Sequence, residues 1–200
     1  MISRVEMARY AASSEAVEKP TRVQVFNLGV AVRVLTSLRQ QRQYPRGLAD
    51  YEKFVGYGLE DARMHNIAGI LASSIADVAR AEVLYLRAAS LVPNEVIYKT
   101  NAIAVQLRQE RISEAIQTAD GITAEQISTL PETNPNAAAQ YAIARAEEAL
   151  MSRQTPNMQL NVDFLTRVVK NDNLLPSLRD RLKKYSESLH VQMSNNQQPD

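Results

Sequence analysis

The side chains that could carry out chemistry are few and lie far apart along the chain. The histidines are His65 and His190, two in all, and neither has a second metal ligand at helical spacing. A packing or surface role is therefore the better interpretation of both. The carboxylates of Glu147 and Glu148 lie among arginines, which is typical of a solvated helix face and not of an isolated acid–base pair. Cysteine is absent, which excludes thiol catalysis and cysteine-ligated metals.

Three short motifs of known chemistry are present only in part. Ser73 and Ser74 lack the glycines of a nucleophile elbow. The run from Asn171 to Asn173 resembles the opening of a calcium loop, but the glycine and the distal glutamate do not follow. The run from Gly56 to Gly58 lacks a preceding strand and a third glycine, so it indicates a helix stop and not a phosphate loop. We therefore expect a non-enzymatic protein without a metal site or a cofactor.

Composition limits the partners and the compartment. The 200 residues carry a formal charge of +1 with both signs interspersed, so no global field favours nucleic acid or an anionic membrane. The longest uncharged apolar stretch, about residues 64–76, is too short to span a bilayer, and charged residues near the start interrupt any signal-peptide core. We expect a soluble protein without membrane insertion. The cytoplasm is favoured, and the periplasm fits if a targeting segment has been removed.

The positioning elements are expected to be helices. Glycine and proline are few, alanine is plentiful, and β-branched residues do not alternate. Apolar residues at helical spacing predict helices over residues 2–19, 22–43 and 45–55, a pair of helices over 59–93 and a second pair over 94–120, then helices over 135–152, 160–170 and 176–190. Asp77 is a candidate N-cap, Pro93 ends one helix, and Thr123 with Gln126 forms a capping-box pattern.

The central stretch from Gly69 to Ile116 organises the chain. Small or aromatic residues recur in three columns, which are Gly47, Ala81 and Ala115; Tyr51, Tyr85 and Ala119; and Phe54, Ala88 and Ile122. With Ala68-Gly69 before it and Pro93 after it, the run Ala81-x3-Tyr85 resembles the tetratricopeptide repeat, a helix–turn–helix unit of about 34 residues. There are departures, because tryptophan is absent and Glu110 stands where the family usually turns on glycine. An all-helical bundle with chance periodicity is the alternative.

The resemblance implies an all-α fold of antiparallel helix pairs, stacked as a short right-handed solenoid with C-terminal capping helices. The expected organisation is an N-terminal helix or arm (1–21), three degenerate repeat-like helix pairs (22–130), a C-terminal helical segment and cap (131–190), and a disordered tail (191–200). The proline-containing run at 131–135 breaks the register and marks the candidate boundary.

The resemblance also implies a concave groove lined by the first helix of each pair. The groove columns of the family fall here on Arg33, Thr36, Arg39, Arg63, Asn66, Ile70, Thr100, Asn101 and Arg108, with Ser73 and Ala104 beside them. Such side chains could hold an extended segment through charge-assisted and amide hydrogen bonds. The lysine–asparagine clamp with which family members bind chaperone tails is largely absent. The groove could equally be filled by the chain's own termini.

We therefore expect an adaptor, chaperone or assembly scaffold that binds a peptide or helix of a protein partner in this groove. The alternative is a structural subunit of a larger complex, which would use its convex face or N-terminal helix; small bacterial arrays of this family often serve secretion or envelope machines. Both readings allow homo- or hetero-oligomers. A small-molecule sensor would need a buried charged cluster, which the sequence does not indicate.

Overall fold

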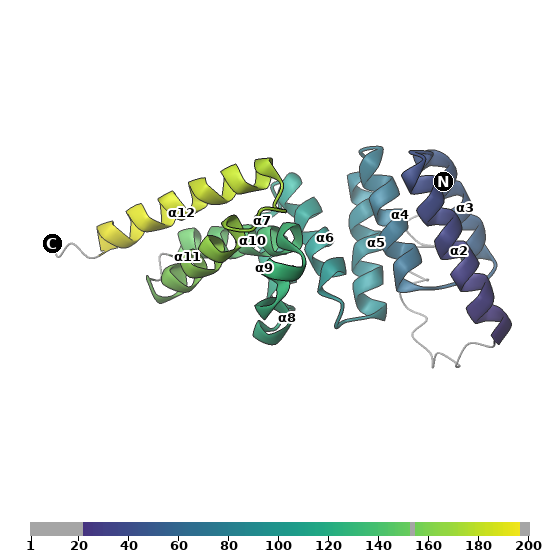
Figure 1. Cartoon of the computed structure of the whole chain (residues 1–200), viewed down its shortest axis with the longest axis horizontal. Coiled ribbons are helices and arrows are strands. Elements are labelled where there is room, and N and C mark those ends of the chain that lie inside the picture. The colour runs from purple at the N-terminus through teal and green to yellow at the C-terminus, as the bar shows by residue number, and fades with distance from the viewer. Residues whose placement is uncertain (1–21, 153–154, 197–200) are drawn as a thin grey trace.

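The computed structural model describes residues 22–152 and 155–196. The expected helix over residues 2–19 lies outside them. Within the described ranges, all regular secondary structure is helical and the helices follow one another along the long axis of the molecule (Figure 1). The first six are α2 (Arg22–Gln40), α3 (Tyr44–Gly56), α4 (Ala62–Ser74), α5 (Val78–Leu91), α6 (Val96–Arg108) and α7 (Ile112–Asp120). They form three consecutive antiparallel pairs, as the repeat resemblance implies.

The three pairs close with the same turn, which shows the repeat at atomic level. Arg42, Ala76 and Glu110 stand 34 positions apart and each has a positive φ, of 57°, 61° and 58°. In each turn this residue donates its backbone N–H three residues back, and the next residue donates five residues back, as in Asp77 N to Ala72 O at 3.0 Å. These two bonds are those of a Schellman motif, which normally uses glycine at this position. Glu110 therefore makes the turn that the family makes with glycine.

Small residues set how closely the helices approach. The columns containing Ala81 and Tyr85 are buried throughout, as expected from their spacing. A Cβ added to Gly69 on α4 would stand 2.6 Å from the ring of Tyr85 on α5. Gly47 on α3 is similarly close to the side chain of Leu71. The absence of a side chain at these crossings lets the aromatic and leucine side chains fill the core.

Local signals in the sequence place most helix ends correctly. Asp77 caps α5 by accepting from Arg80 N, and α5 ends before Pro93. Thr123 and Gln126 form the expected capping box, which opens α8 (Ala124–Ser128). Asn134 accepts from Ala137 N at the start of α10. The remaining helices are α9 (Leu130–Thr133), α10 (Pro135–Ser152), α11 (Thr155–Val169) and α12 (Pro176–Asn196).

The C-terminal part departs from the prediction in two places. The segment 155–157 is helical and belongs to α11, where a loop is expected. Helix α12 continues to Asn196, whereas the lack of periodicity predicts disorder after residue 190. The extension is stabilised by long-range contacts, because Gln192 donates to the carbonyl of Leu150 on α10 and Met193 packs on the C-terminal core. The predicted boundary at residue 131 falls within α9, and it stays a prediction.

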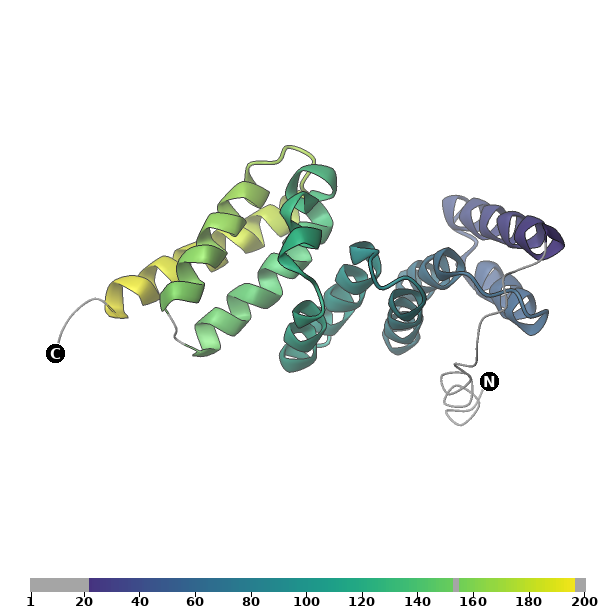
Figure 2. The same ribbon diagram turned by 90° about the horizontal axis from the view of Figure 1, so that it is seen from below.

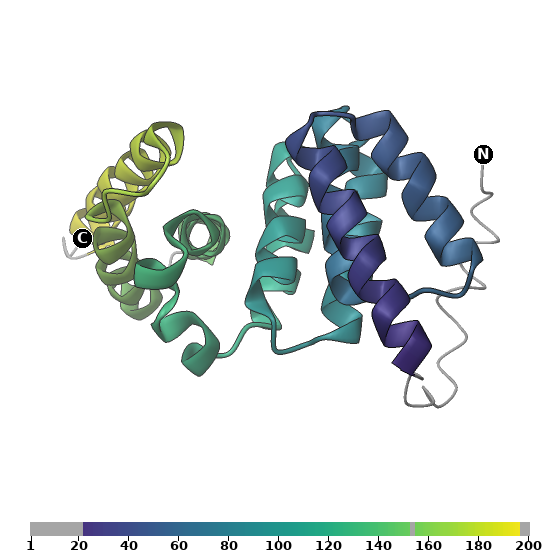
Figure 3. The ribbon, with the colours of Figure 1, turned by 45° about the vertical axis from the view of Figure 1, so that its right-hand side comes forward.

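The two larger hydrophobic cores of the described residues meet on α6. One is built from α2 to α6 and includes Ala102 and Val105; the other extends from α6 to α12 and includes Ile103 and Leu107. Helix α10 packs against both α6 and α7, and α12 lies along α10 and α11 (Figure 2). Figure 3 shows α10 to α12 grouped on one side of α6 and the first pairs on the other. No helix of the described part is long and apolar enough to cross a membrane.

Candidate partner-binding surface

The first helices of the second and third pairs form a continuous polar face. Asn101 on α6 donates its Nδ2–H to Oδ1 of Asn66 on α4 at 2.8 Å. Toward one end of the same face, Arg108 Nη2 donates to Ser73 Oγ at 2.6 Å. Each pair joins positions 35 residues apart, so equivalent turns of consecutive repeats touch. We call the surface made by these four residues the inner surface.

A pocket of about 350 Å³ opens from the inner surface. Its walls combine α4, α5 and α6 with side chains from α10 and α12. The lining residues are Ser73, Tyr85, Asn101, Ala104, Val105, Arg108, Gln140, Leu178 and Arg181. The C-terminal helices thus close one end of the inner surface. Both polar and apolar side chains line the pocket.

Tyr85 joins the pocket to the helix crossing beneath it. Its ring packs on Gly69 and is 5% exposed, and it also lines the pocket. Burial raises the pKa of the Tyr85 hydroxyl to about 12, while the charges of Arg108 and Arg39 act in the opposite direction. Both guanidinium groups are therefore close enough to act electrostatically on this hydroxyl.

Arginines at the pocket differ from arginines elsewhere in their partners. Among the described residues, Arg39, Arg108 and Arg181 have no carboxylate within ion-pair distance. Most other arginines do, and these are Arg46, Arg63, Arg80, Arg87, Arg111, Arg145 and Arg167. The pocket lining itself includes no acidic residue. No direct ion pair among the described residues therefore neutralises the arginines that line the pocket.

Of the expected groove residues, the printed contacts bring Asn66, Asn101 and Arg108 to this region, but not the majority. Arg33 is exposed on α2, Thr36 donates to its own helix at Val32 O, and Ile70 is half-buried on α4. Arg63 is held by Asp61, with Nη2 to Oδ2 at 2.8 Å, and does not line the pocket. Thr100 differs from the prediction because it is only 1% exposed. It shares a helix face with Val96, Ile103 and Leu107, so it belongs to the core.

Sequence reasoning misses the pocket residues that come from distant elements. Gln140, Leu178 and Arg181 belong to α10 and α12, which lie outside the repeats. Nothing in their local sequence indicates that they face α6. The repeat pattern predicts Tyr85 as a core residue, and this is correct, but it gives no sign of the pocket. Gln140, Leu178 and Arg181 are found only from the three-dimensional structure, in which α10 and α12 contribute to the same pocket as α6.

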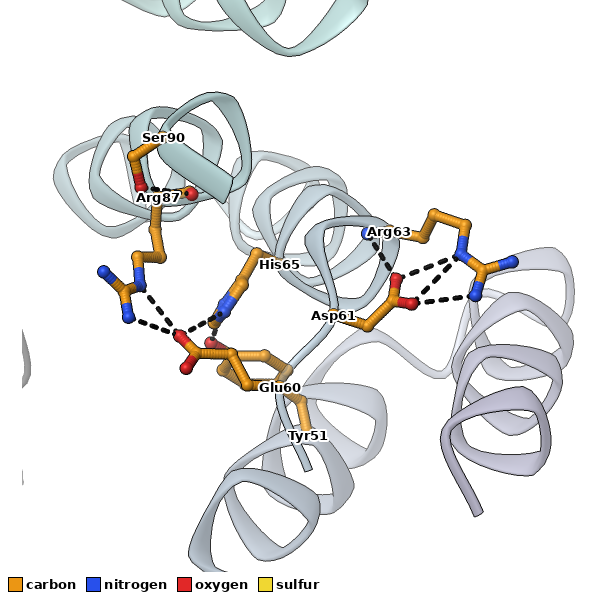
Figure 4. A network of polar contacts seen from close by, with 7 residues as sticks. All are labelled: Tyr51, Glu60, Asp61, Arg63, His65, Arg87 and Ser90. Atoms are coloured by element: carbon orange, nitrogen blue, oxygen red, sulfur yellow. Dashed lines mark hydrogen bonds and ion pairs between the residues drawn. The ribbon is translucent and has the colours of Figure 1, made fainter. Parts of the chain in front are cut away.

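A second polar cluster lies between the first and second pairs (Figure 4). Buried His65 on α4 has its Nδ1 2.6 Å from the hydroxyl of Tyr51 and its Nε2 3.2 Å from Glu60 Oε1. Glu60 also accepts from Arg87 of α5 at 2.6 Å. Burial lowers the pKa of His65, although Glu60 acts to raise it. The cluster ties α3, α4 and α5 together, which gives His65 a structural role.

The described residues offer no metal cluster, and a second hollow lies away from the inner surface. Within the described ranges, no group of three or more histidine, aspartate or glutamate side chains could hold a metal ion. A hollow of about 660 Å³ lies where α10 and α12 end, between Leu150 and Val191, and none of the expected groove residues lines it. The inner surface with its pocket is therefore the candidate site.

Comparison with known proteins bears on the fold. No protein-family model matches the chain, and no curated protein matches it. The structure is similar to the solved structure of the MamA RS-1 ArsTM double mutant, with a TM-score of 0.57 and 12% sequence identity, over 87% of this chain and 98% of that chain. MamA is a tetratricopeptide-repeat protein. The all-α, repeat-like fold expected from the sequence is confirmed, and the chain has a tetratricopeptide-like fold.

Proposed function

We propose that this protein is a non-enzymatic interaction module that holds a segment of a protein partner on its inner surface, as an adaptor, chaperone or assembly scaffold. The observation that carries the proposal is the continuity of the inner surface with the pocket. Asn66 and Asn101, then Ser73 and Arg108, line up along two consecutive repeats and end where Arg181 enters from α12. Amide and guanidinium groups in a row can hydrogen-bond the main chain of an extended segment.

The test is capture of partners from lysate of the source organism with three forms of the full chain, read by mass spectrometry. The forms are wild type, Arg39→Glu with Arg108→Glu, and a control with the same charge change outside the pocket, Lys170→Glu with Lys184→Glu. Both control lysines are exposed. A partner retained by wild type and control but lost by the pocket variant supports the proposal. A partner retained equally by all three forms overturns it.

A second candidate function is a structural subunit that uses its outer face. Val83 and Leu86 on α5 are 45% and 40% exposed, and their spacing places them on one side of the helix. Apolar side chains exposed together can belong to a protein interface. Val83→Ser with Leu86→Ser separates the two functions. Loss of the partner with this variant, and its retention with the pocket variant, would favour the outer face.

A further inference from the structure

Two guanidinium groups from separate helices meet at the end of the inner surface. Arg108 and Arg181 both line the pocket. They come from α6 and α12, so their proximity depends on the whole fold and not on one charged helix face. Like charges gathered in this way repel one another and raise the free energy of the unoccupied surface.

The partners that these arginines have within the chain are neutral. Arg108 donates to the hydroxyl of Ser73 at 2.6 Å. Arg181 donates to the hydroxyl of Tyr185 at 3.4 Å and lies 5.7 Å from the centre of its ring. The Tyr185 hydroxyl itself donates to Glu147. A guanidinium group has five N–H donors, so most donors of Arg108 and Arg181 are not used by the described residues.

A carboxylate is the group that fits this surface. It accepts two parallel hydrogen bonds from a guanidinium group, and its charge offsets the repulsion among the arginines. Ser73, Asn101 and Gln140 add neutral donors around the same pocket. The volume of about 350 Å³ lies at the lower end of the range for ligand pockets and has room for acidic side chains.

We infer that the segment held on the inner surface is acidic, with two or more aspartate or glutamate side chains that pair with Arg108 and Arg181. The inference rests on the proposed function and names the chemistry of the partner. The bond partners are side-chain carboxylates within the segment, because the two guanidinium groups come from separate helices and the single charge of one chain terminus could not neutralise both.

The experiment is selection of random peptides from a phage library, displayed through their C-terminal end so that no terminal carboxylate is free. The full-length chain is the immobilised target. Wild type is compared with two double variants. The pocket variant carries Arg108→Gln and Arg181→Gln and keeps most of each side chain's packing. The control variant carries Lys170→Gln and Lys184→Gln. Circular dichroism establishes that each variant is folded.

The expected result is a strong enrichment of aspartate and glutamate in peptides selected by wild type and by the control, lost with the pocket variant. The best peptide is then synthesised with an amidated end, beside a version with asparagine and glutamine in place of its acids. Fluorescence anisotropy should show at least about tenfold weaker binding of the neutral version. Binding of the acidic version should also weaken between about 0.05 M and about 0.3 M salt.

The possible failures are distinct. Wild type could select peptides that the pocket variant no longer selects but that carry no excess of acidic residues. This result would overturn the inference and leave the proposed function standing. Enrichment of acids that persists with the pocket variant would overturn the assignment of the acids to Arg108 and Arg181. Selection of no peptide by any form would count against both the inference and the proposed function.

Discussion

At the scale of single residues, the three turn positions show how the fold is made without the expected glycines. Arg42, Ala76 and Glu110 all adopt left-handed backbone geometry. A non-glycine residue in this region costs about 1–2 kcal/mol because its Cβ approaches the following carbonyl group. The chain accepts this cost three times. The pairs on both sides must therefore contribute enough packing to hold each turn.

Glu110→Gly should raise the free energy of unfolding by about 1 kcal/mol, because glycine adopts the left-handed region without a Cβ clash. Urea denaturation measures the change. Glu110→Ala is the matched control, since it removes the same exposed side chain and keeps the Cβ. An increase in stability with alanine as large as that with glycine would show that the backbone conformation is not the cause.

His65 should make stability dependent on pH. Burial lowers its pKa in the folded chain below the ordinary value of 6.5, so on acidification the unfolded chain takes up this proton first. The free energy of unfolding should therefore be largest above about pH 7 and should fall as the pH drops below about 6.5. Urea denaturation at several pH values between about 7.5 and 5.5 tests this.

The control for His65 is the other histidine. His190 is exposed on α12, and His190→Gln should keep the decline in stability, whereas His65→Gln should reduce it. Glu60 and Asp61 act to raise the pKa of His65, and Arg87 acts to lower it. An unchanged decline in His65→Gln would assign the pH dependence to other groups.

At the scale of helices, the crossing of α4 and α5 is where one missing side chain decides the packing. Gly69→Ala should lower the free energy of unfolding by about 1–3 kcal/mol, because the new Cβ would overlap the ring of Tyr85 at 2.6 Å. Thermal or urea denaturation gives the value. Gly29→Ala on α2 is the control, because a Cβ there meets nothing within 4 Å. It should be neutral or stabilising, since alanine favours helix. Equal effects of the two substitutions would contradict this account of the crossing.

Helix ends could be predicted where a local signal exists, and failed where tertiary contacts decide. Asp77, Pro93 and the capping box at Thr123 act within a few residues of themselves, so their effect can be read from the sequence. The last turn of α12 has no such signal. It is helical because Gln192 donates to Leu150 of α10, which lies 42 residues earlier in the sequence, and because Met193 packs on the C-terminal core.

The candidate site divides in the same way. Asn66, Asn101 and Arg108 are predicted because the repeat assigns them to equivalent positions of consecutive first helices. Thr100 fails because periodicity gives the spacing of a helix face but does not decide which neighbouring helix that face meets. Arg181 could not be predicted, because no repeat relates α12 to α6.

At the scale of the whole molecule, the two hydrophobic cores share only α6, so the chain should respond to damage locally. Leu35 of α2 is fully buried in the first core, and Leu182 of α12 in the second. In arrays of this kind each unit is stabilised mainly by its nearest neighbours. A large cavity in one core costs about 2–5 kcal/mol and should loosen that half first.

Hydrogen exchange with mass spectrometry should therefore show faster exchange in α2 to α4 for Leu35→Ala, with α10 to α12 still protected. Leu182→Ala is the reciprocal variant and should show the opposite pattern. Equal loss of protection along the chain in both variants would mean that α6 couples the two cores into one cooperative unit, contrary to this expectation.

The central claim is that a protein partner lies on the inner surface, and site-directed photo-crosslinking tests it most directly. The chain has no native cysteine, so Ala104→Cys in the pocket and Val83→Cys on the outer face of α5 each provide a single attachment point for a benzophenone probe. In lysate, one partner should be crosslinked from residue 104. The Arg39→Glu and Arg108→Glu substitutions should abolish this product, and a probe at residue 83 should not give it. Crosslinking of the partner from residue 83 and not from residue 104 would contradict the account.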